Sequence, residues 1–242
     1  MARSGDALRR NAERIREEHG VEVETEALDL AATDGVPRLI AELDRRGRTV
    51  DLLVNNAGAG TVGPFLDSAS ARHVSSVELN VVALMNLTHA LGGRMAARGS
   101  GGIINVASTA AFQAMPYQAT YAATKAFVLS FTEALAEELR GSGVRVMAAH
   151  PGATATGFFD GTTATMNPAF TDQPERVAAR TLDAFAKGAI NAYPGRASMR
   201  ATTWAARLLP RTAVTRATGR LNRSLGHHHA RHLDAPTAPG QP

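Results

Sequence analysis

A tyrosine and a lysine four residues apart are the best candidates for proton transfer in this chain. Tyr121 and Lys125 are four residues apart, so on a helix both side chains lie on one face and can point into one site. A nearby ammonium favours the ionised form of a phenol. Only two of the chain's 26 lysines and arginines are lysines, Lys125 and Lys187, which indicates that position 125 needs a compact ammonium. The alternative is a chance pairing of a surface tyrosine and lysine.

A hydroxyl is predicted to join this pair. Residues 101–108 begin with two glycines, continue as a short apolar run and end at Ser108, which predicts a buried strand with a serine at its carboxyl end. Open α/β sheets bind their ligands at that end of the strands. A strand-end serine, a helix-borne tyrosine and a lysine one turn further can therefore converge on a carbonyl oxygen. The alternative for Ser108 is a hydroxyl that only satisfies a turn.

The elements that must position these side chains alternate between strand and helix patterns. Short apolar or alternating runs predict strands, amphipathic patterns predict helices, and the first stretch, 5–18, is rich in helix formers. This alternation predicts an α/β fold with a doubly wound, Rossmann-like parallel sheet. The expected strands are 21–30, 51–57, 101–108 and 144–149, and the expected helices are 36–46, 67–98 and 174–187.

Composition limits the class of protein. A chain of 242 residues with 44% hydrophobic and 20% charged residues can bury one sizeable core, and we expect a single domain over residues 1–225. The absence of cysteine excludes disulfides and thiolate metal sites, and we predict no metal. No apolar run has the length of a membrane span and the first residues lack a signal peptide's hydrophobic region, so the expected location is the cytoplasm.

Five motifs resemble the short-chain dehydrogenase/reductase family in their order and spacing. They lie within the stretch from Val21 to Pro194, and the region beyond it resembles the family only loosely. The motifs are Asn55-Asn56-Ala57-Gly58, Asn80-Val81, Ser108, Tyr121-Ala-Ala-Thr-Lys125 and Pro151-Gly152-Ala-Thr-Ala-Thr156.

The resemblance implies an NAD(P)-dependent oxidoreductase that interconverts a carbonyl and an alcohol by hydride transfer. In that mechanism Tyr121 is the general acid/base, Lys125 lowers its pKa, and Ser108 holds the substrate oxygen. Asn80 would interrupt its helix and hold a water that links Lys125 to solvent. The alternative for Asn80 is an ordinary surface helix residue.

The resemblance also implies contacts to the cofactor, which we expect to be NADP, with NAD as the alternative. Asp29 would accept a hydrogen bond from the adenine amino group; its alternative is an N-cap for the helix near Val36. Arg3 would meet the 2′-phosphate of NADP. Besides Tyr121 and Lys125, the remaining expected contacts are the ribose-facing backbone of Asn56, Ala57 and Gly58 and the nicotinamide-facing Pro151, Gly152, Thr154 and Thr156.

The family's first strand, glycine-rich loop, first helix and most of its second strand have no counterpart here. We therefore expect a Rossmann-like sheet that is incomplete at the N-terminus, through a late gene start or through degeneration, and in which residues 21–30 have no sheet partner. The alternative function is a non-catalytic remnant acting as a dimerisation or membrane-surface module. Residues 58–63 satisfy G-x-G-x-x-G, but they match the end of the family's fourth strand better than a phosphate-binding loop.

The substrate and the C-terminal region are less constrained. An apolar pocket wall, or equally a mobile lid, is predicted from Phe158, Phe159, Met166 and Phe170, which favours a lipid-like, cyclic or aromatic substrate. His150, beside the end of a predicted strand, is interpreted as structural.

Residues 196–231 contain eight arginines and no acid, and their helical part, 200–225, is a basic amphipathic segment interrupted by Pro210. We expect it to pack beside the substrate pocket or against another subunit of a homodimer or homotetramer, with a membrane surface as the alternative. Nucleic-acid binding is not expected, because no aromatic stacking pattern accompanies the arginines. Residues 226–242 are predicted to form a disordered tail without a metal-binding role for their histidines.

Overall fold

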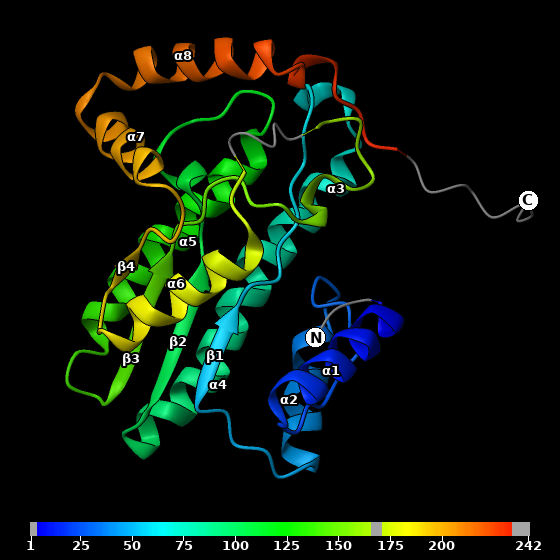
Figure 1. Cartoon of the computed structure of the whole chain (residues 1–242), viewed down its shortest axis with the longest axis vertical. Helices are drawn as coiled ribbons and strands as arrows, with labels where there is room; N and C mark the ends of the chain where they lie inside the picture. Colours follow the sequence, from blue (N-terminus) through cyan, green and yellow to red (C-terminus); the bar gives the residue numbers. More distant parts are fainter. Residues whose placement is uncertain (1–3, 166–170, 234–242) are drawn as a thin grey trace, which may run out of the picture.

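A four-stranded parallel sheet forms the centre of the protein in the computed structural model, which describes residues 4–165 and 171–233 (Figure 1). The strands lie in the order β1 (Leu52–Asn55), β2 (Gly101–Val106), β3 (Val144–Ala149) and β4 (Asn191–Ala192). In register, Leu53 pairs with Ile103 and Ile103 with Val146. All neighbours are parallel, as the sequence predicts.

Helices cover both faces of this sheet, which explains why its central strands are apolar throughout. On one face, Ile104 and Met147 pack against Phe185 of α6 (Pro174–Ala186). On the other, Ile103 and Val146 pack against α4 (Leu84–Arg98) and α5 (Ala119–Glu138). Figure 1 shows α6 in front of the sheet, with α4 and α5 behind it. The predicted doubly wound architecture is therefore confirmed.

An N-terminal layer, residues 4–49, lies beside α4 rather than in the sheet. It consists of α1 (Gly5–His19), an extended segment, and α2 (Gly35–Arg45). The prediction of a strand at residues 21–30 is wrong, because only an isolated bridge at Ala27 occurs there. The segment is fastened by its side chains instead: Leu28 packs with α2 and α4, and its glutamates pair with arginines that follow α2.

The expected absence of a sheet partner for residues 21–30 matches this arrangement. Alternating apolar residues form a strand only when a neighbouring strand accepts and donates their backbone hydrogen bonds. At the near edge of the sheet, β1 has a strand neighbour on one side only, among the residues that the structure describes. Its Leu52 and Val54 side chains are 39% and 46% exposed.

The long helical pattern predicted at 67–98 is one helical stretch with a wider turn in it. Helix α3 (Ser70–Val77) passes into a π-helical turn (Glu78–Ala83) and then into α4. π-Turns of this kind insert an extra residue into a helix and occur frequently at functional sites. The irregular turn contains Asn80, the residue predicted to interrupt the helix.

Two helices and a short extension complete the described chain. Helices α7 (Ala197–Leu208) and α8 (Arg211–Ser224) are separated at Pro210, as expected. Figure 1 places both beyond the end of the sheet to which β1 points. The segment 226–233, part of the predicted disordered tail, instead forms a 3-10 turn (His227–His229) and hydrogen bonds with residues 161–163, while residues 234–242 lie outside the described residues. No described helix has both the length and the apolar character needed to span a membrane.

Candidate active site

The tyrosine and lysine predicted to share a face do so in the first turns of α5. The Lys125 ammonium lies 5.8 Å from the centre of the Tyr121 ring. It donates a hydrogen bond of 2.7 Å to the carbonyl oxygen of Val106, the last residue of β2. Its side chain is packed between helix and sheet, and the residue is only 5% exposed. A surface pairing, the alternative drawn from the sequence, is therefore excluded.

Ser108 brings the third functional group to the same place. It lies two residues beyond the end of β2, which is shorter than the predicted strand 101–108, and its hydroxyl is hydrogen-bonded to the Tyr121 phenol. The same oxygen accepts a hydrogen bond of 3.1 Å from the amide of Ala110, which fixes it at the start of a 3-10 turn (Thr109–Phe112). The structure thus unites Ser108, Tyr121 and Lys125, and the turn-capping role considered as an alternative coexists with this contact.

Burial shifts the pKa values of both Lys125 and Tyr121. It lowers the pKa of Lys125 from 10.5 to about 8, because the charged ammonium loses its hydration. Burial also raises the pKa of Tyr121 above its ordinary value of 10.0, and the hydrogen bond between Tyr121 and Ser108 opposes that rise. The expected lowering of the Tyr121 pKa by Lys125 is thus not the prevailing effect, because burial of the phenol dominates.

Asn80 fixes the turn after β1 above this lysine. Its side-chain amide donates 2.8 Å to the carbonyl of Ala59, and its side-chain oxygen accepts 2.9 Å from the amide of the same residue. A third hydrogen bond, of 3.0 Å, joins it to Thr124 on α5. Asn80 is 1% exposed, so it is not the surface residue considered as an alternative. Its side chain ties the turn to α5, the helix that carries the catalytic candidates.

The turn of Asn56, Ala57 and Gly58 is exposed to solvent and lies beside the Lys125 ammonium. A Cβ atom on Gly58 would lie 3.5 Å from the lysine nitrogen and 3.2 Å from the Asn80 side-chain oxygen. A side chain here would crowd both groups, so glycine keeps the backbone close to the site. After Gly63 only a three-residue 3-10 turn (Phe65–Asp67) forms before α3, which does not fit a phosphate-binding loop at 58–63.

The residues expected to face the nicotinamide lie in the loop after β3, and they differ in their distance from the site and in their exposure. Pro151 and Gly152 follow β3, and the Pro151 carbonyl accepts from Ser108 at 3.5 Å, so this loop borders the site. Thr154 is bonded back to Gly152, and Thr156 is exposed.

Two of the expected contacts belong to the N-terminal part of the chain. Asp29 lies in the N-terminal layer, where its carboxylate accepts from the Ala31 amide at 3.0 Å. The N-cap of α2 is Asp34, so the alternative that Asp29 caps this helix is wrong. Arg3 lies outside the described residues.

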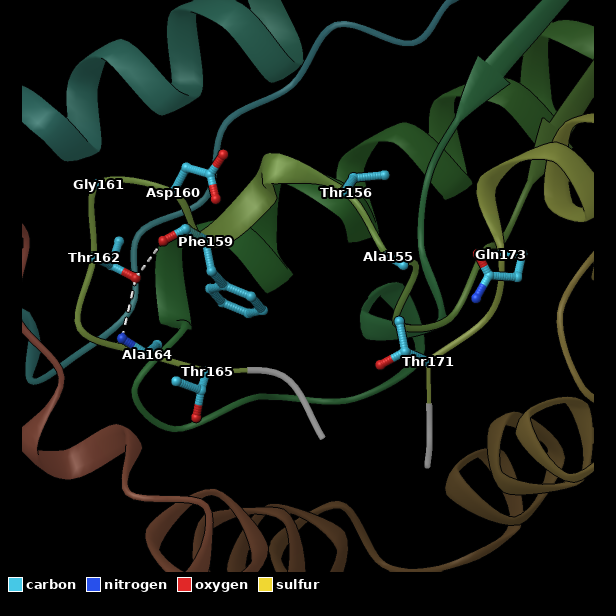
Figure 2. A pocket seen from close by; sticks show the side chains of 10 residues that line it. All are labelled: Ala155, Thr156, Phe159, Asp160, Gly161, Thr162, Ala164, Thr165, Thr171 and Gln173. Carbon is cyan, nitrogen blue, oxygen red and sulfur yellow. Dashed lines mark hydrogen bonds between the residues drawn. The ribbon is translucent and has the colours of Figure 1, made fainter. Parts of the chain in front are cut away.

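Aromatic side chains cover the Tyr121 ring. The Phe158 ring meets it edge-on, with 5.0 Å between ring centres, and touches Gly60 so closely that a Cβ there would lie 2.3 Å from it. Phe159 instead points into an open cavity of about 670 Å³ that Thr156, Asp160 and Gln173 also line (Figure 2). Of the four residues predicted to form an apolar wall, Phe158 packs on Tyr121 and Phe159 lines this cavity, whereas Met166 and Phe170 lie outside the described residues.

The C-terminal segment holds this aromatic loop, a role that the sequence analysis missed. The Thr163 amide donates 2.9 Å to the Arg231 carbonyl, and the Leu233 amide donates 2.8 Å to Gly161. His227 is buried against Phe159, with 6.3 Å between ring centres, and contacts Gln118 at 3.4 Å just before α5. No local pattern predicts these contacts, because they join positions up to 109 residues apart in the chain.

The remaining histidine expectation agrees with the structure. His150 is buried between the rings of Phe112 and Tyr193, and its Nε2 lies 2.8 Å from the Asn191 side chain. Burial lowers its pKa, so it stays neutral in a structural role. Within the described residues, no group of three or more potential ligands could hold a metal ion.

The family model for short chain dehydrogenases matches residues 1–167, more than half of the chain. The chain belongs to the short chain dehydrogenase family. The predicted membership is thereby confirmed, and so is the Rossmann-like fold, because solved structures of this family superimpose on the described sheet and helices.

Individual short chain dehydrogenases and reductases show how far the likeness extends. Ketoacyl reductase HetN of Nostoc sp. is 34% identical over 124 residues, 51% of this chain and 43% of that protein. Sulfoacetaldehyde reductase 2 of Chromohalobacter salexigens is 37% identical over 140 residues, 57% of this chain and 56% of that protein. The solved short-chain dehydrogenase from Sphingobium yanoikuyae, in complex with NADPH, is 28% identical, with a TM-score of 0.74 over 85% of this chain and 82% of that chain. The chain spans about half the length of the curated relatives it matches.

Proposed function

We propose that this chain carries the catalytic residues of an NAD(P)-dependent oxidoreductase that interconverts a carbonyl and an alcohol. The observation that carries the proposal is one cluster: a phenol hydrogen-bonded to the Ser108 hydroxyl, with a buried ammonium 5.8 Å from its ring. A phenol of this kind can exchange a proton with a substrate oxygen, which is general acid/base catalysis. Named reductases among the relatives support the same reaction class.

Each residue has a definite task in this proposal. In the reducing direction, a nicotinamide cofactor held here would supply the hydride for the carbonyl carbon. Tyr121 gives its proton to the carbonyl oxygen, and Ser108 donates a hydrogen bond that holds this oxygen in place. Lys125, positively charged below a pH of about 8, stabilises the tyrosinate that remains. Asn80 acts through Ala59 and Thr124 as a positioning residue.

The residues present fit the ribose and nicotinamide end of such a cofactor. The exposed turn of residues 56–58 leaves its backbone open beside the Lys125 ammonium, and the loop from Pro151 to Thr156 borders Ser108. We expect NADP, with NAD as the alternative, and the NADPH complex of the Sphingobium yanoikuyae structure supports this choice. Phe158 and Phe159 favour an apolar substrate. A homodimer or homotetramer and a cytoplasmic location stay predictions.

Single-turnover oxidation of NADPH with a panel of cyclic and aromatic ketones tests the proposal. We expect Tyr121→Phe to lower the rate constant for the hydride step by roughly 10²–10⁴-fold, because the proton donor is lost. The rate of the wild-type chain should fall as the pH rises through about 8, where Lys125 loses its charge.

Tyr117→Phe is the matched control for this experiment. Its hydroxyl accepts from Arg223 at 3.4 Å in the loop before α5, so its removal should leave the rate unchanged. Equal rates for Tyr121→Phe and Tyr117→Phe would refute the assignment of Tyr121. A folded wild-type chain that turns over none of the ketones, with saturating NADPH, would favour the non-catalytic alternative.

A further inference from the structure

Helix α7 presents an uncharged, apolar face to solvent. It is anchored by Thr203, which is buried, and by contacts with the 3-10 turn after Ser108. On its far side Trp204 is 53% exposed and Leu208 is 82% exposed. These side chains form one stripe at helical spacing with three exposed alanines: Ala197, Ala201 and Ala205. Leu209, directly after the helix, extends this apolar face and is itself exposed.

Arginines surround this stripe without balancing acids. Arg200 and Arg207 lie between it and the anchored side of the helix, and their guanidinium groups are 5.5 and 4.9 Å from the ring centres of Tyr193 and Phe112. Helix α8, together with its C-cap residue, adds four more arginines and two exposed leucines at i, i+4 spacing. These are Arg211, Arg216, Arg220, Arg223, Leu221 and Leu225. Within the part of the chain that the structure describes, none of the six arginines of α7 and α8 forms an ion pair with a carboxylate.

We propose that α7 and α8 dock on the surface of an anionic phospholipid bilayer. Trp204, Leu208 and Leu209 would enter the boundary between headgroups and acyl chains, and the arginines would meet the lipid phosphates. Tryptophan is enriched at this boundary because its ring is apolar and its N–H is polar.

Charge decides between a bilayer and a second copy of the chain as the occupant of this face. A symmetric contact between two copies would place the acid-free segment from Arg196 to Arg231 against itself, which opposes like charges. An anionic bilayer supplies the opposite charge over the whole surface. The occupant with complementary charge is therefore the bilayer.

Trp204 is the only tryptophan of the chain, so its fluorescence reports directly on this face. The purified full chain is titrated with vesicles of mixed phosphatidylglycerol and phosphatidylcholine, and with vesicles of phosphatidylcholine alone. We expect a blue shift of the emission and co-sedimentation with the mixed vesicles only. High salt should reverse both, because it screens the arginines.

Two variants separate the apolar from the electrostatic contribution. Leu208→Glu should lower the partition coefficient roughly tenfold or more, because it removes an inserted apolar side chain. Leu66→Glu is its matched control: the same change at a leucine that is 90% exposed outside α7 and α8 should have little effect. The double variant Arg211→Gln, Arg220→Gln should lower partitioning roughly fivefold per arginine. Circular dichroism and thermal melting confirm that each variant is folded.

Four outcomes would overturn the proposal. The first is a folded wild-type chain that binds neither kind of vesicle. The second is equal binding to both kinds, which would remove the role of the arginines. The third is a blue shift that depends on protein concentration without lipid and accompanies dimer formation, which would assign the face to a second copy. The fourth is binding of a DNA duplex as tight as that of mixed vesicles, with Leu208→Glu affecting neither. Failure of ketone turnover leaves the proposal standing, because no step of it involves the catalytic residues.

Discussion

Charged side chains are paired at the surface in the N-terminal layer, whereas the charge beside the sheet is buried without a partner of opposite charge among the described residues. In the layer, Arg46 pairs at the surface with Glu24, Glu26 and Glu42, and these pairs join the extended segment to the end of α2. At the sheet, Lys125 of α5 is buried against the neutral carbonyl of Val106 in β2, and the described residues provide no carboxylate for it. Exposed ion pairs contribute little to stability, whereas a buried unpaired ammonium is costly. Perturbed charges of this kind cluster at functional sites, so the contrast supports the proposal that Lys125 belongs to the active site.

The central strands are also more tightly packed than the N-terminal layer. Ile103, Ile104 and Met147 in the central strands are 0% exposed. In the N-terminal layer, Leu28, Val36 and Leu39 pack on one side of α4, and no strand of the layer joins the sheet. The layer is thus attached by one apolar cluster and by surface charges, and we expect it to open locally before the sheet unfolds.

The largest expected effect tests this difference in cooperativity. Met147→Ala should lower the free energy of global unfolding by about 2–5 kcal/mol, because it leaves a cavity in the centre of the sheet. Leu39→Ala should mainly lower the free energy of opening of the layer. Native-state hydrogen exchange measures both, through the amides of residues 101–106 and those of residues 35–45. If Leu39→Ala weakens protection in β2 as much as in α2, the two regions unfold as one.

The second prediction concerns the buried ammonium. The pKa of Lys125 is lowered from 10.5 to about 8, so between these pH values the unfolded chain binds more protons than the folded one. Stability conferred by this site therefore rises with pH across that window, by a total of about 3 kcal/mol. In Lys125→Met this rise should be absent, so the stability of the variant relative to wild type should be greatest below pH 8 and fall by about 3 kcal/mol by pH 10.5.

Urea denaturation at a series of pH values measures this effect. The only other lysine, Lys187, is exposed and provides the control Lys187→Met, which should keep the wild-type dependence. The diagnostic quantity is the slope of the unfolding free energy against pH. The absolute difference between variant and wild type is not diagnostic, because loss of the hydrogen bond to Val106 shifts stability equally at every pH. Parallel curves for wild type and Lys125→Met would show that the ammonium keeps its ordinary pKa when folded.

The smallest expected effect comes from the surface charges of the N-terminal layer. Arg45 first, and then Arg46, hold the pKa of Glu42 down, from 4.5 to about 2. The stabilising contribution of this carboxylate is therefore present above pH 4.5 and is lost as the pH falls towards 2. Glu42→Gln should be slightly less stable than wild type at neutral pH and low salt, and equal to it at high salt.

Thermal melting at two ionic strengths measures this small difference. Glu13→Gln, at an exposed position of α1 outside the network, is the control for the loss of a surface carboxylate. A Glu42→Gln effect as large as that of Met147→Ala, or one insensitive to salt, would contradict the view that surface charge is of minor importance in this layer.

Local sequence patterns predicted most of the sheet and its helices. The strand at 144–149 has the predicted bounds, and the helical pattern at 67–98 is present from Ser70 to Arg98. These patterns succeed because side chains two, three or four residues apart fix the face that is buried. The same reasoning failed for residues 21–30, whose alternation is that of a strand but whose backbone pairs with no strand of the sheet. Periodicity describes one segment, whereas a strand also requires a neighbour.

By itself, the sequence determined that Tyr121 and Lys125 share a face, that Ser108 lies close to the carboxyl end of a buried strand, and that the chain has the fold of its family. Only the tertiary structure decided how deeply the ammonium is buried, that Phe158 covers the Tyr121 ring, and that the C-terminal segment holds the aromatic loop. The physical reason is the distance along the chain over which each effect acts. Side-chain spacing acts over a few residues, whereas burial and hydration are set by groups that folding brings together from distant positions, as it does for Gln118 and His227.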